Sequence, residues 1–315
     1  MEPEKVGRIL KGYMDQGFTV VKILSVELLM AQEGNTCGPL DWVDELRAVE
    51  EKVRQVTRTG TRAESSAANA LLYDFNRIPH PFTNMHVTEQ GLDQLDEYIG
   101  RVRSVIGTKV PLAIDHFGHF PLPDMIKIAR RLEKYHLAWL EDMLPWYLTD
   151  QYRELKHATT APIATGEDMY LAESFEPLLQ AGALDVVHPD LLTSGGILET
   201  KKLGDLAARY GASMALHMCE SPVSALAGAH MATASENFFA QEHDAFDSEW
   251  WQDLIIGPVK PIVKDGFTVI TDAPGLGIEG LNEDLIREHG PMKGKDVWVS
   301  TDEWNQETSL DRIWS

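Results

Sequence analysis

Six ionisable residues recur along the middle of the chain at nearly constant spacing. They are Asp115, Glu141, Glu167, Asp190, His217 and Glu242, and successive residues are separated by 26, 26, 23, 27 and 25 positions. Carboxylates that converge on one place repel each other unless they are protonated or bind a cation. Oxygen ligands suit a hard divalent ion, so Asp115, Glu141 and Glu167 predict a metal site for Mg²⁺, with Mn²⁺ as the alternative. A histidine beside them has a pKa suited to proton transfer near neutral pH.

Each of these residues also has a simpler interpretation. The ends of buried strands are often polar because they meet water, and a histidine such as His217 can bond to a backbone carbonyl in the core. The shared spacing, and not any single position, therefore favours a common site. Other ionisable residues nearby fall outside this spacing and are interpreted as structural or loop positions, namely His116, His188 and Glu220.

The six positions lie at or near the ends of short apolar segments that alternate with amphipathic helices. Strands are predicted at 110–115, 137–142, 162–168, 185–190, 213–218 and 237–242. Helices are predicted at 91–107, 124–135, 150–159, 171–182, 197–211 and 224–235. This alternation is typical of parallel βαβ units and favours an α/β fold, a (β/α)8-type TIM barrel whose functional residues lie at the C-terminal strand ends. An open doubly wound sheet is the alternative, but no GxGxxG fingerprint follows a first strand.

The barrel domain is predicted to occupy residues 1–250, with a long insertion at 27–90. An insertion of this length exceeds the usual βα connection and indicates a lid or an oligomer contact. Within it, residues 41–56 have the pattern of a helix with a charged outer face. Residues 251–315 are predicted to form a C-terminal extension that packs on the barrel or on a cap.

The composition narrows the classes of function. The chain has 315 residues, 43% of them hydrophobic, and a net charge of −21. This charge argues against a nucleic-acid partner and against docking on an anionic membrane surface. Two cysteines are too few for a disulfide framework, and no apolar run is long enough to span a bilayer. We therefore expect a cytoplasmic protein that acts on a small molecule.

Several motifs, taken in order, resemble the enolase superfamily and within it the mandelate racemase-like subgroup, which contains many acid-sugar dehydratases. They cover roughly residues 91–315, with GFTVVK (17–22) as a match upstream. The motifs are LAIDHFGH, AWLEDM, PIATGED, VVHPDLLTSGGI, MALHM, NFFAQE, DAPGLGIEGLNEDL and the tail LDRIWS. The resemblance is nearest to the mannonate and galactonate dehydratases, and it implies a modified TIM barrel.

The resemblance also implies a role for each of the spaced residues. The family's Mg²⁺ ligands match Asp115, Glu141 and Glu167. Its His–Asp pair matches His217 and Asp190. Its glutamate after the eighth strand, which contacts the substrate carboxylate or the forming enolate, is matched by the last of the six, Glu242.

The chain departs from the family pattern at two motifs. Lys22 matches the first lysine of a Lys-x-Lys motif, but Leu24 takes the place of the second, which weakens a racemase interpretation. The family's Asp-x-His pattern would put histidine at position 117, which is Phe117. Because side chains alternate along a strand, His119 is in phase with Asp115 and is the preferred second acid.

A third departure concerns the N-terminal part. Family members begin with a capping domain and a first barrel strand, whereas this sequence opens with the pattern of a first barrel helix, VGRILKGYMDQG (6–17). Both the cap and the first strand are therefore expected to be lacking. Without the cap, loops that close over a substrate would also be lacking.

The predicted function is that of a Mg²⁺-dependent dehydratase, a hydro-lyase acting on an aldonate or aldarate. His217 would remove the proton next to the carboxylate, giving an enediolate, and His119 or His217 would protonate the departing 3-hydroxyl. Lys22 would hold the substrate carboxylate or assist the enolate. The product would be a 2-keto-3-deoxy acid.

Two alternatives remain open at the level of the sequence. The same scaffold could carry an epimerase, racemase or cycloisomerase. The chain could also be an inactive barrel fragment that binds only a metal or a partner. In each case we expect a homo-oligomer.

Overall fold

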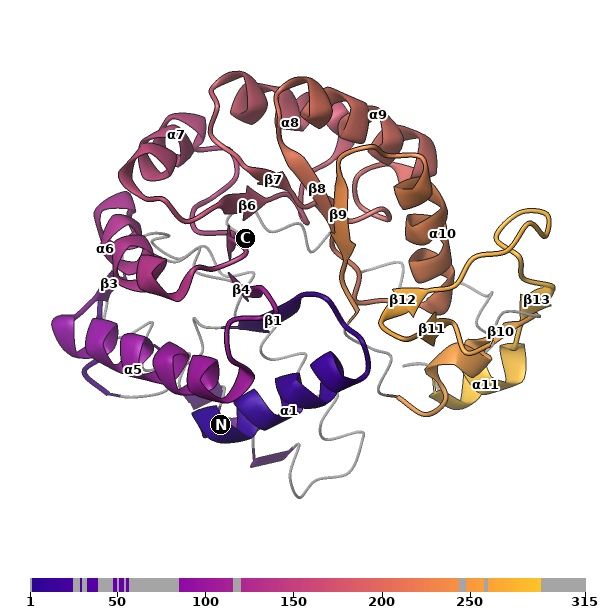
Figure 1. The fold of residues 1–315 in the computed structure, drawn as a ribbon, viewed down its shortest axis with the longest axis horizontal. Helices are drawn as coiled ribbons and strands as arrows, with labels where there is room; N and C mark the ends of the chain where they lie inside the picture. Colours follow the sequence, from indigo (N-terminus) through magenta and orange to yellow (C-terminus); the bar gives the residue numbers. More distant parts are fainter. Residues whose placement is uncertain are drawn as a thin grey trace.

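A curled sheet of seven parallel strands forms the centre of the protein (Figure 1). The computed structural model describes residues 2–24, 33–38, 85–115, 120–243, 248–257 and 260–289, together with Leu29 and residues 48–49, 51–53 and 55–56. The strand order is β1-β4-β5-β6-β7-β8-β9, and each neighbouring pair is parallel. The strands are β1 (Val21–Leu24), β4 (Leu112–Asp115), β5 (Leu140–Glu141), β6 (Ile163–Thr165), β7 (Val186–Val187), β8 (Ser213–Leu216) and β9 (Phe238–Gln241).

Helices connect the strands and cover the outer face of the sheet (Figure 1). They are α1 (Pro3–Asp15), α5 (Glu89–Ile106), α6 (Leu122–Leu132), α7 (Thr149–Ala158), α8 (Leu171–Gln180), α9 (Gly196–Arg209) and α10 (Pro222–Thr233). Successive helices pack on one another, for example α1 on α5 and α8 on α9. The α/β class and the predicted order of strands and helices are confirmed. The architecture is that of a curled half-barrel, as in enolase-type TIM barrels.

The two faces of the sheet carry different side chains, as a period of two requires. Along β4, Leu112 and Ile114 pack under the helices in the main core, while Ala113 faces the inside of the curl. The inner layer is made mainly of small residues around one large ring and consists of Ala113, Trp139, Ala164, Val186 and Ala215. Small inner side chains leave room above this layer, at the C-terminal ends of the strands.

The helix α5 shows how the sequence pattern produces the outer layer. Its apolar residues recur at helical spacing, and these residues are buried, namely Leu92, Leu95, Ile99, Val102 and Ile106. Thr88 caps the N-terminus, where its side chain accepts a hydrogen bond from the amide of Gly91. This helix holds β4 and β1 in place from outside.

The sheet is open along one side. Among the described residues, β1 and β9 are each paired with a single strand. The insertion predicted at 27–90 contributes β2 (Thr36–Cys37) and β3 (His86–Val87), which pair antiparallel. Most of this insertion, including most of the helix predicted at 41–56, lies outside the described residues.

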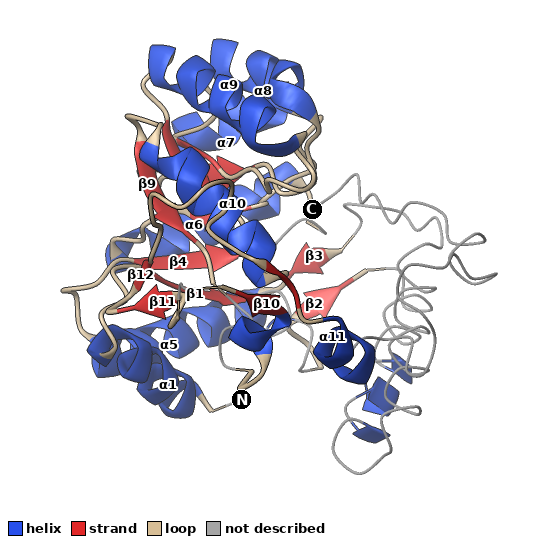
Figure 2. Ribbon diagram, turned by 90° about the vertical axis from the view of Figure 1, so that its right-hand side faces the viewer, coloured by secondary structure: helices blue, strands red, loops and turns tan. Residues whose placement is uncertain are grey.

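Residues after β9 pack beside α10 (Figure 2). They form η3 (Trp251–Leu254), β10 (Ile255–Ile256), β11 (Val263–Lys264), β12 (Phe267–Thr268), β13 (Gly280–Leu281) and α11 (Glu283–His289). Trp251 is buried in a cluster with Met218 and Leu226. The predicted domain boundary at residue 250 stays a prediction.

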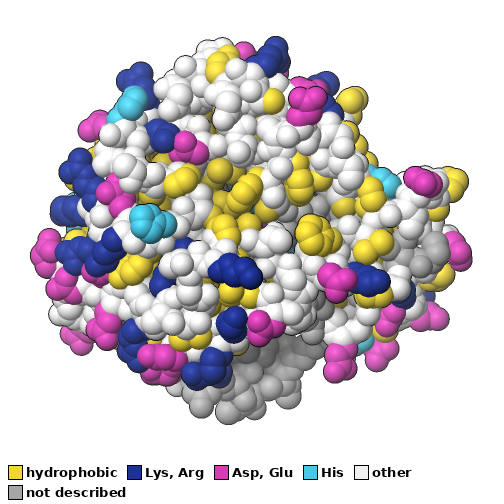
Figure 3. All heavy atoms as spheres, in the orientation of Figure 1, with side chains coloured by type: hydrophobic (Ala, Val, Ile, Leu, Met, Phe, Trp, Pro, Cys, Tyr) yellow, Lys and Arg dark blue, Asp and Glu magenta, His cyan; other side chains and the backbone are white. Residues whose placement is uncertain are grey.

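The surface agrees with the composition. On the face drawn in Figure 3, charged side chains gather around the rim and apolar side chains lie towards the centre. Among the helices that the structure describes, none combines the length and the apolar character that a membrane crossing requires.

Candidate active site

The spaced residues of the sequence meet at one end of the curled sheet. They lie at or just after the C-terminal ends of six consecutive strands, as Asp115 (β4), Glu141 (β5), Glu167 (β6), Asp190 (β7), His217 (β8) and Glu242 (β9). Adjacent parallel strands in register end at the same level, which explains why one residue per repeat is enough to build the site. The expectation that the spacing brings these side chains together agrees with the geometry.

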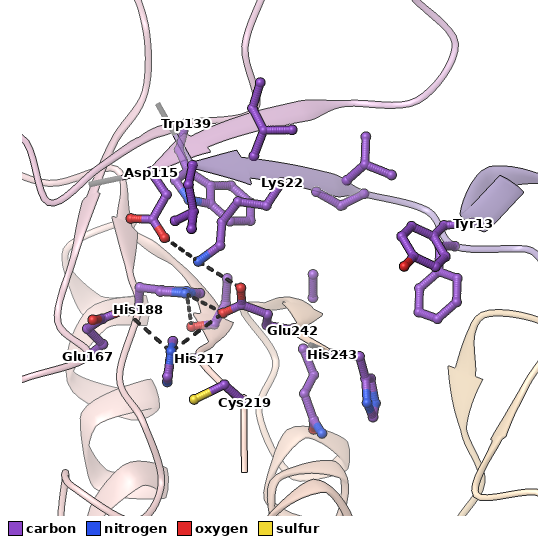
Figure 4. Close-up of a pocket in the computed structure, with 18 of the residues that line it drawn as sticks. Tyr13, Lys22, Asp115, Trp139, Glu167, His188, His217, Cys219, Glu242 and His243 are labelled. Carbon is purple, nitrogen blue, oxygen red and sulfur yellow. Dashed lines mark hydrogen bonds and ion pairs between the residues drawn. The ribbon is translucent and has the colours of Figure 1, made fainter. Parts of the chain in front are cut away.

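Lys22 lies at the centre of the carboxylates (Figure 4). Its Nζ is 2.9 Å from Oδ2 of Asp115, 2.9 Å from Oε1 of Glu141 and 2.8 Å from Oε1 of Glu242. Burial lowers the pKa of Lys22, but the charges of Glu141, Asp115 and Glu242 raise it well above its usual value. Lys22 is therefore an ammonium that neutralises part of the cluster. We call these four residues the carboxylate cluster.

Glu141 is the most enclosed member of this cluster. It is fully buried, its Oε2 accepts a hydrogen bond of 2.6 Å from Nε1 of Trp139, and its Oε1 lies 3.2 Å from Nε2 of His188. Burial raises the pKa of Glu141, but the charges of His188 and Lys22 lower it well below its usual value. This carboxylate is ionised at neutral pH.

His188, interpreted from the sequence as a structural residue, lines the same cavity as Lys22 and Asp115. Its Nε2 also lies 3.5 Å from Oε2 of Glu242, and its Nδ1 is 3.1 Å from the carbonyl oxygen of Ala215. Burial lowers the pKa of His188, but Glu141 and Glu242 raise it to about 9. The signal was present in the sequence, because His188 precedes Asp190 by two residues and so shares its face of the strand.

His217 and Asp190 form a pair across β8 and the segment after β7. Nδ1 of His217 lies 2.7 Å from Oδ2 of Asp190, and an isolated backbone bridge joins the two residues. On the other side of the ring, Nε2 is 3.4 Å from Glu167 and 3.9 Å from Glu242. Burial lowers the pKa of His217, but hydrogen bonds to Asp190 and Cys219 and the charges of Glu167 and Glu242 raise it to about 12.

The turn after Asp190 fixes the position of the Asp190 carboxylate. Its Oδ1 accepts hydrogen bonds from the amides of Leu192 at 2.6 Å and Thr193 at 3.3 Å. Burial raises the pKa of Asp190, but its hydrogen bonds lower it below its usual value. The Asp190 side chain is thus oriented from two sides, and it holds the His217 ring in one position.

Glu220 was interpreted as a loop acid, but it lies beside this pair. It is half-buried, and its oxygens lie 3.6 Å from Sγ of Cys219 and 3.4 Å from Oγ of Ser224. The indole of Trp251 donates a hydrogen bond of 2.8 Å to its backbone carbonyl. Burial and the hydrogen bond to Asp190 raise the pKa of Glu220 to about 7.

The carboxylates fit a hard divalent ion. Oxygens of Asp115, Glu141 and Asp142 lie within 4.8 Å of one another, and Glu167 lines the same cavity as Asp115. Asp142, which the sequence did not single out, is buried and accepts a 2.6 Å hydrogen bond from Thr165, while its Oδ2 has no hydrogen-bond partner in the described part of the chain. An all-oxygen donor set with such a buried free oxygen suits Mg²⁺ or Mn²⁺.

A cavity of about 390 Å³ opens above these groups. Lys22, Asp115 and His217 line its charged end, and Tyr13 lies away from them (Figure 4). Phe18 also lines the cavity. This volume suits a small organic ligand. His119, the predicted second acid, lies outside the described residues, as does His116.

The fold is a half-barrel, and carboxylates and a His–Asp pair lie at the ends of its strands. These features define a class of α/β protein whose functional site lies at the mouth of the barrel. A family model described as "Enolase C-terminal domain-like" matches residues 80–285. The chain belongs to this family and thus to the enolase superfamily, in the subgroup of mandelate racemase and muconate lactonizing enzyme.

Known relatives include several sugar-acid dehydratases. The chain is 32% identical over 206 residues to D-xylonate dehydratase of Haloferax volcanii, covering 65% of this chain and 49% of the relative. It is 26% identical over 226 residues to D-gluconate dehydratase of Thermoproteus tenax, covering 69% of this chain and 45% of the relative. The chain thus spans about half the length of these curated relatives.

A solved structure agrees with this assignment. The crystal structure of a mandelate racemase/muconate lactonizing enzyme-like protein from Rubrobacter xylanophilus superposes with a TM-score of 0.70 at 26% identity. The superposition covers 91% of this chain and 61% of that protein. The resemblance inferred from the motifs is therefore confirmed at the level of superfamily and fold.

Proposed function

We propose that this chain carries the active site of a Mg²⁺-dependent sugar-acid dehydratase, a hydro-lyase that converts an aldonate or aldarate into a 2-keto-3-deoxy acid. The observation that carries the proposal is the arrangement across one cavity of a fixed His–Asp pair and a carboxylate cluster. The relatives support it, since those compared above are dehydratases of D-xylonate and D-gluconate.

The difficulty of the reaction explains the need for both groups. A hydrogen next to a carboxylate is barely acidic, so its removal needs a base and strong stabilisation of the new negative charge. When bound, an ion held by Asp115, Glu141 and Glu167 supplies positive charge that stabilises the deprotonated acid and lowers the pKa of His217. The other steps depend on side chains of the chain itself.

His217 is the proposed proton-transfer group. Its Nδ1 faces Asp190, so Nε2 is the atom that exchanges a proton with a ligand in the cavity. With a pKa of about 12 it carries a proton at neutral pH, and in this form it can protonate a departing hydroxyl. Accepting a proton first requires that the charges of Glu167 and Glu242 be neutralised.

Two further cations are suited to hold an anionic substrate. Lys22 and His188 both line the cavity, and the pKa of His188 is about 9, so both are positively charged at neutral pH. Either can donate a hydrogen bond to a carboxylate or a hydroxyl. Glu242, between them, is placed to contact the same part of the ligand.

The test is an assay of the full chain with D-xylonate, D-gluconate and D-galactonate in the presence of Mg²⁺. We expect formation of a 2-keto-3-deoxy acid from at least one acid, detected by mass spectrometry, and its loss in His217→Asn. The exposed His157 on α7 gives the matched control, His157→Asn, which should retain the activity. Deuterium incorporation into recovered substrate without keto product would instead favour an epimerase.

A further inference from the structure

The Lys22 ammonium holds the same oxygens that the proposed metal ion needs. Its three carboxylate partners lie at 2.8–2.9 Å and come from β4, β5 and the end of β9. Two of them, Asp115 and Glu141, are proposed ligands of the ion. The side chains are well enclosed, with exposed fractions of 15% for Lys22, 5% for Asp115 and 0% for Glu141.

Distances show that the two cations compete for one position. Mg²⁺ binds carboxylate oxygens at about 2.0–2.1 Å. An ion bound to Oδ2 of Asp115 and Oε1 of Glu141 would therefore compete for the same two oxygens with Nζ of Lys22, which lies 2.9 Å from both. Two unpaired cations cannot share that volume, because their repulsion in a poorly hydrated site is large.

An alternative binding position for the ion lies beside Asp142. One carboxylate oxygen of Asp142 lies within 4.8 Å of oxygens of Asp115 and Glu141, and an ion there could leave Lys22 in place. However, Asp142 is completely buried and does not line the cavity, whereas Lys22 and Asp115 do. An ion that enters from the cavity meets first Asp115 and Glu242, whose oxygens Lys22 contacts.

We propose that Lys22 is a tethered counter-ion that exchanges with the divalent ion. This inference rests on the proposed function, since it assumes a metal site at the carboxylate cluster. Binding of the ion at Asp115 and Glu141 releases the ammonium, and the flexible four-carbon stem of Lys22 lets it turn into the cavity of about 390 Å³. There the released ammonium faces the space that an anionic substrate would occupy. The ion would thereby prepare the site for a carboxylate ligand.

Lysine labelling of the unsubstituted full chain tests the exchange. The protein is treated with acetic anhydride with and without saturating Mg²⁺ at matched ionic strength, and acetylation of each lysine is followed by peptide mass spectrometry. We expect labelling of Lys22 to rise about fourfold with Mg²⁺, towards that of Lys202, because their side chains are 15% and 59% exposed. Labelling of Lys202 and Lys134, both on the surface, should not change.

Calorimetry of Mg²⁺ binding to the same sample separates the outcomes. If Mg²⁺ binds and Lys22 stays protected, the exchange is wrong, the ion occupies the Asp142 side, and the proposed function is unaffected. If no Mg²⁺ binds, both the exchange and the metal-dependent function are overturned. Because neither measurement needs a variant, a failure to fold cannot obscure the result.

A substitution gives a second, independent readout. In Lys22→Met the ion no longer has to displace an ammonium, so we expect Mg²⁺ to bind on the order of tenfold more tightly by calorimetry. The matched control is Lys202→Met, which should bind as the unsubstituted chain does. Equal or weaker binding by Lys22→Met would contradict the exchange.

Discussion

The two sides of the cavity organise their charges in different ways. On one side, the carboxylate cluster gathers Lys22, Asp115, Glu141 and Glu242 from β1, β4, β5 and the end of β9, which include both edges of the sheet. On the other side, His217 and Asp190 follow adjacent strands, and a backbone bridge joins them.

The difference indicates that the two sides of the cavity have different functions. The carboxylate cluster has three acids against one ammonium, so it carries excess negative charge and is suited to bind a cation. The pair of His217 and Asp190 is held in one geometry by backbone amides, so it is suited to move a proton at one atom. Substitution of His217 should therefore spare metal binding, whereas substitution of a carboxylate should weaken it.

The largest expected effect is on the histidine side. His217→Asn should lower the rate of keto-acid formation by about 10²–10⁴-fold, because the proton-transfer group is removed. Its affinity for Mg²⁺, measured by calorimetry, should stay within about threefold of the unsubstituted chain, since no proposed ligand has changed. A variant that lost metal binding together with activity would show that the two sides are not separate.

A change on the carboxylate side should act first on metal binding. Glu141→Gln keeps the shape of the side chain but removes a charge, and we expect Mg²⁺ affinity to fall by at least about 10–100-fold. The matched control is Glu173→Gln on the exposed face of α8, which should bind Mg²⁺ as the unsubstituted chain does. Unchanged calorimetric affinity in Glu141→Gln would remove Glu141 from the metal site.

A smaller effect is expected at the hydrogen bond behind Glu141. Trp139→Phe keeps an aromatic side chain but removes the indole N–H and its 2.6 Å hydrogen bond to Oε2, and the loss of this bond should lower the free energy of unfolding by about 1.5–3 kcal/mol. Urea denaturation measures this, with Trp250→Phe, whose ring stacks on His289, as the matched variant. Equal losses in both variants would mean that the charged hydrogen bond adds nothing.

The smallest effect concerns the pH dependence of stability. The pKa of Glu220 is raised to about 7, so the unfolded chain releases this proton at lower pH than the folded chain does. The free energy of unfolding should therefore fall as pH rises from about 4.5 to 7 and should lose part of this slope in Glu220→Gln. Urea denaturation at several pH values gives the slopes, and identical slopes would contradict the raised pKa.

The strand ends could be predicted from the sequence because the repeat fixes them. A unit of about 25 residues and parallel strands in register leave little freedom in where Asp115, Glu141 and His217 can lie. The pair of His217 and Asp190 followed from the same argument.

Other features needed the three-dimensional structure. Strand alternation places His188 on the same face as Val186, but its contacts with Glu141 and Glu242 could not be predicted from that alternation. The ion pair of Lys22 with Glu242 joins strands at opposite ends of the sheet order, which no local spacing encodes. Asp142 turns inward through a backbone with φ of 46°, an orientation that simple strand alternation does not predict.

The most direct measurement is electron paramagnetic resonance of Mn²⁺ bound to the full chain after treatment with a chelator. We expect one Mn²⁺ per chain with oxygen ligands only, and loss of this signal in Glu141→Gln. Nitrogen coupling from His217, or the absence of a bound ion, would contradict a metal site at the carboxylate cluster.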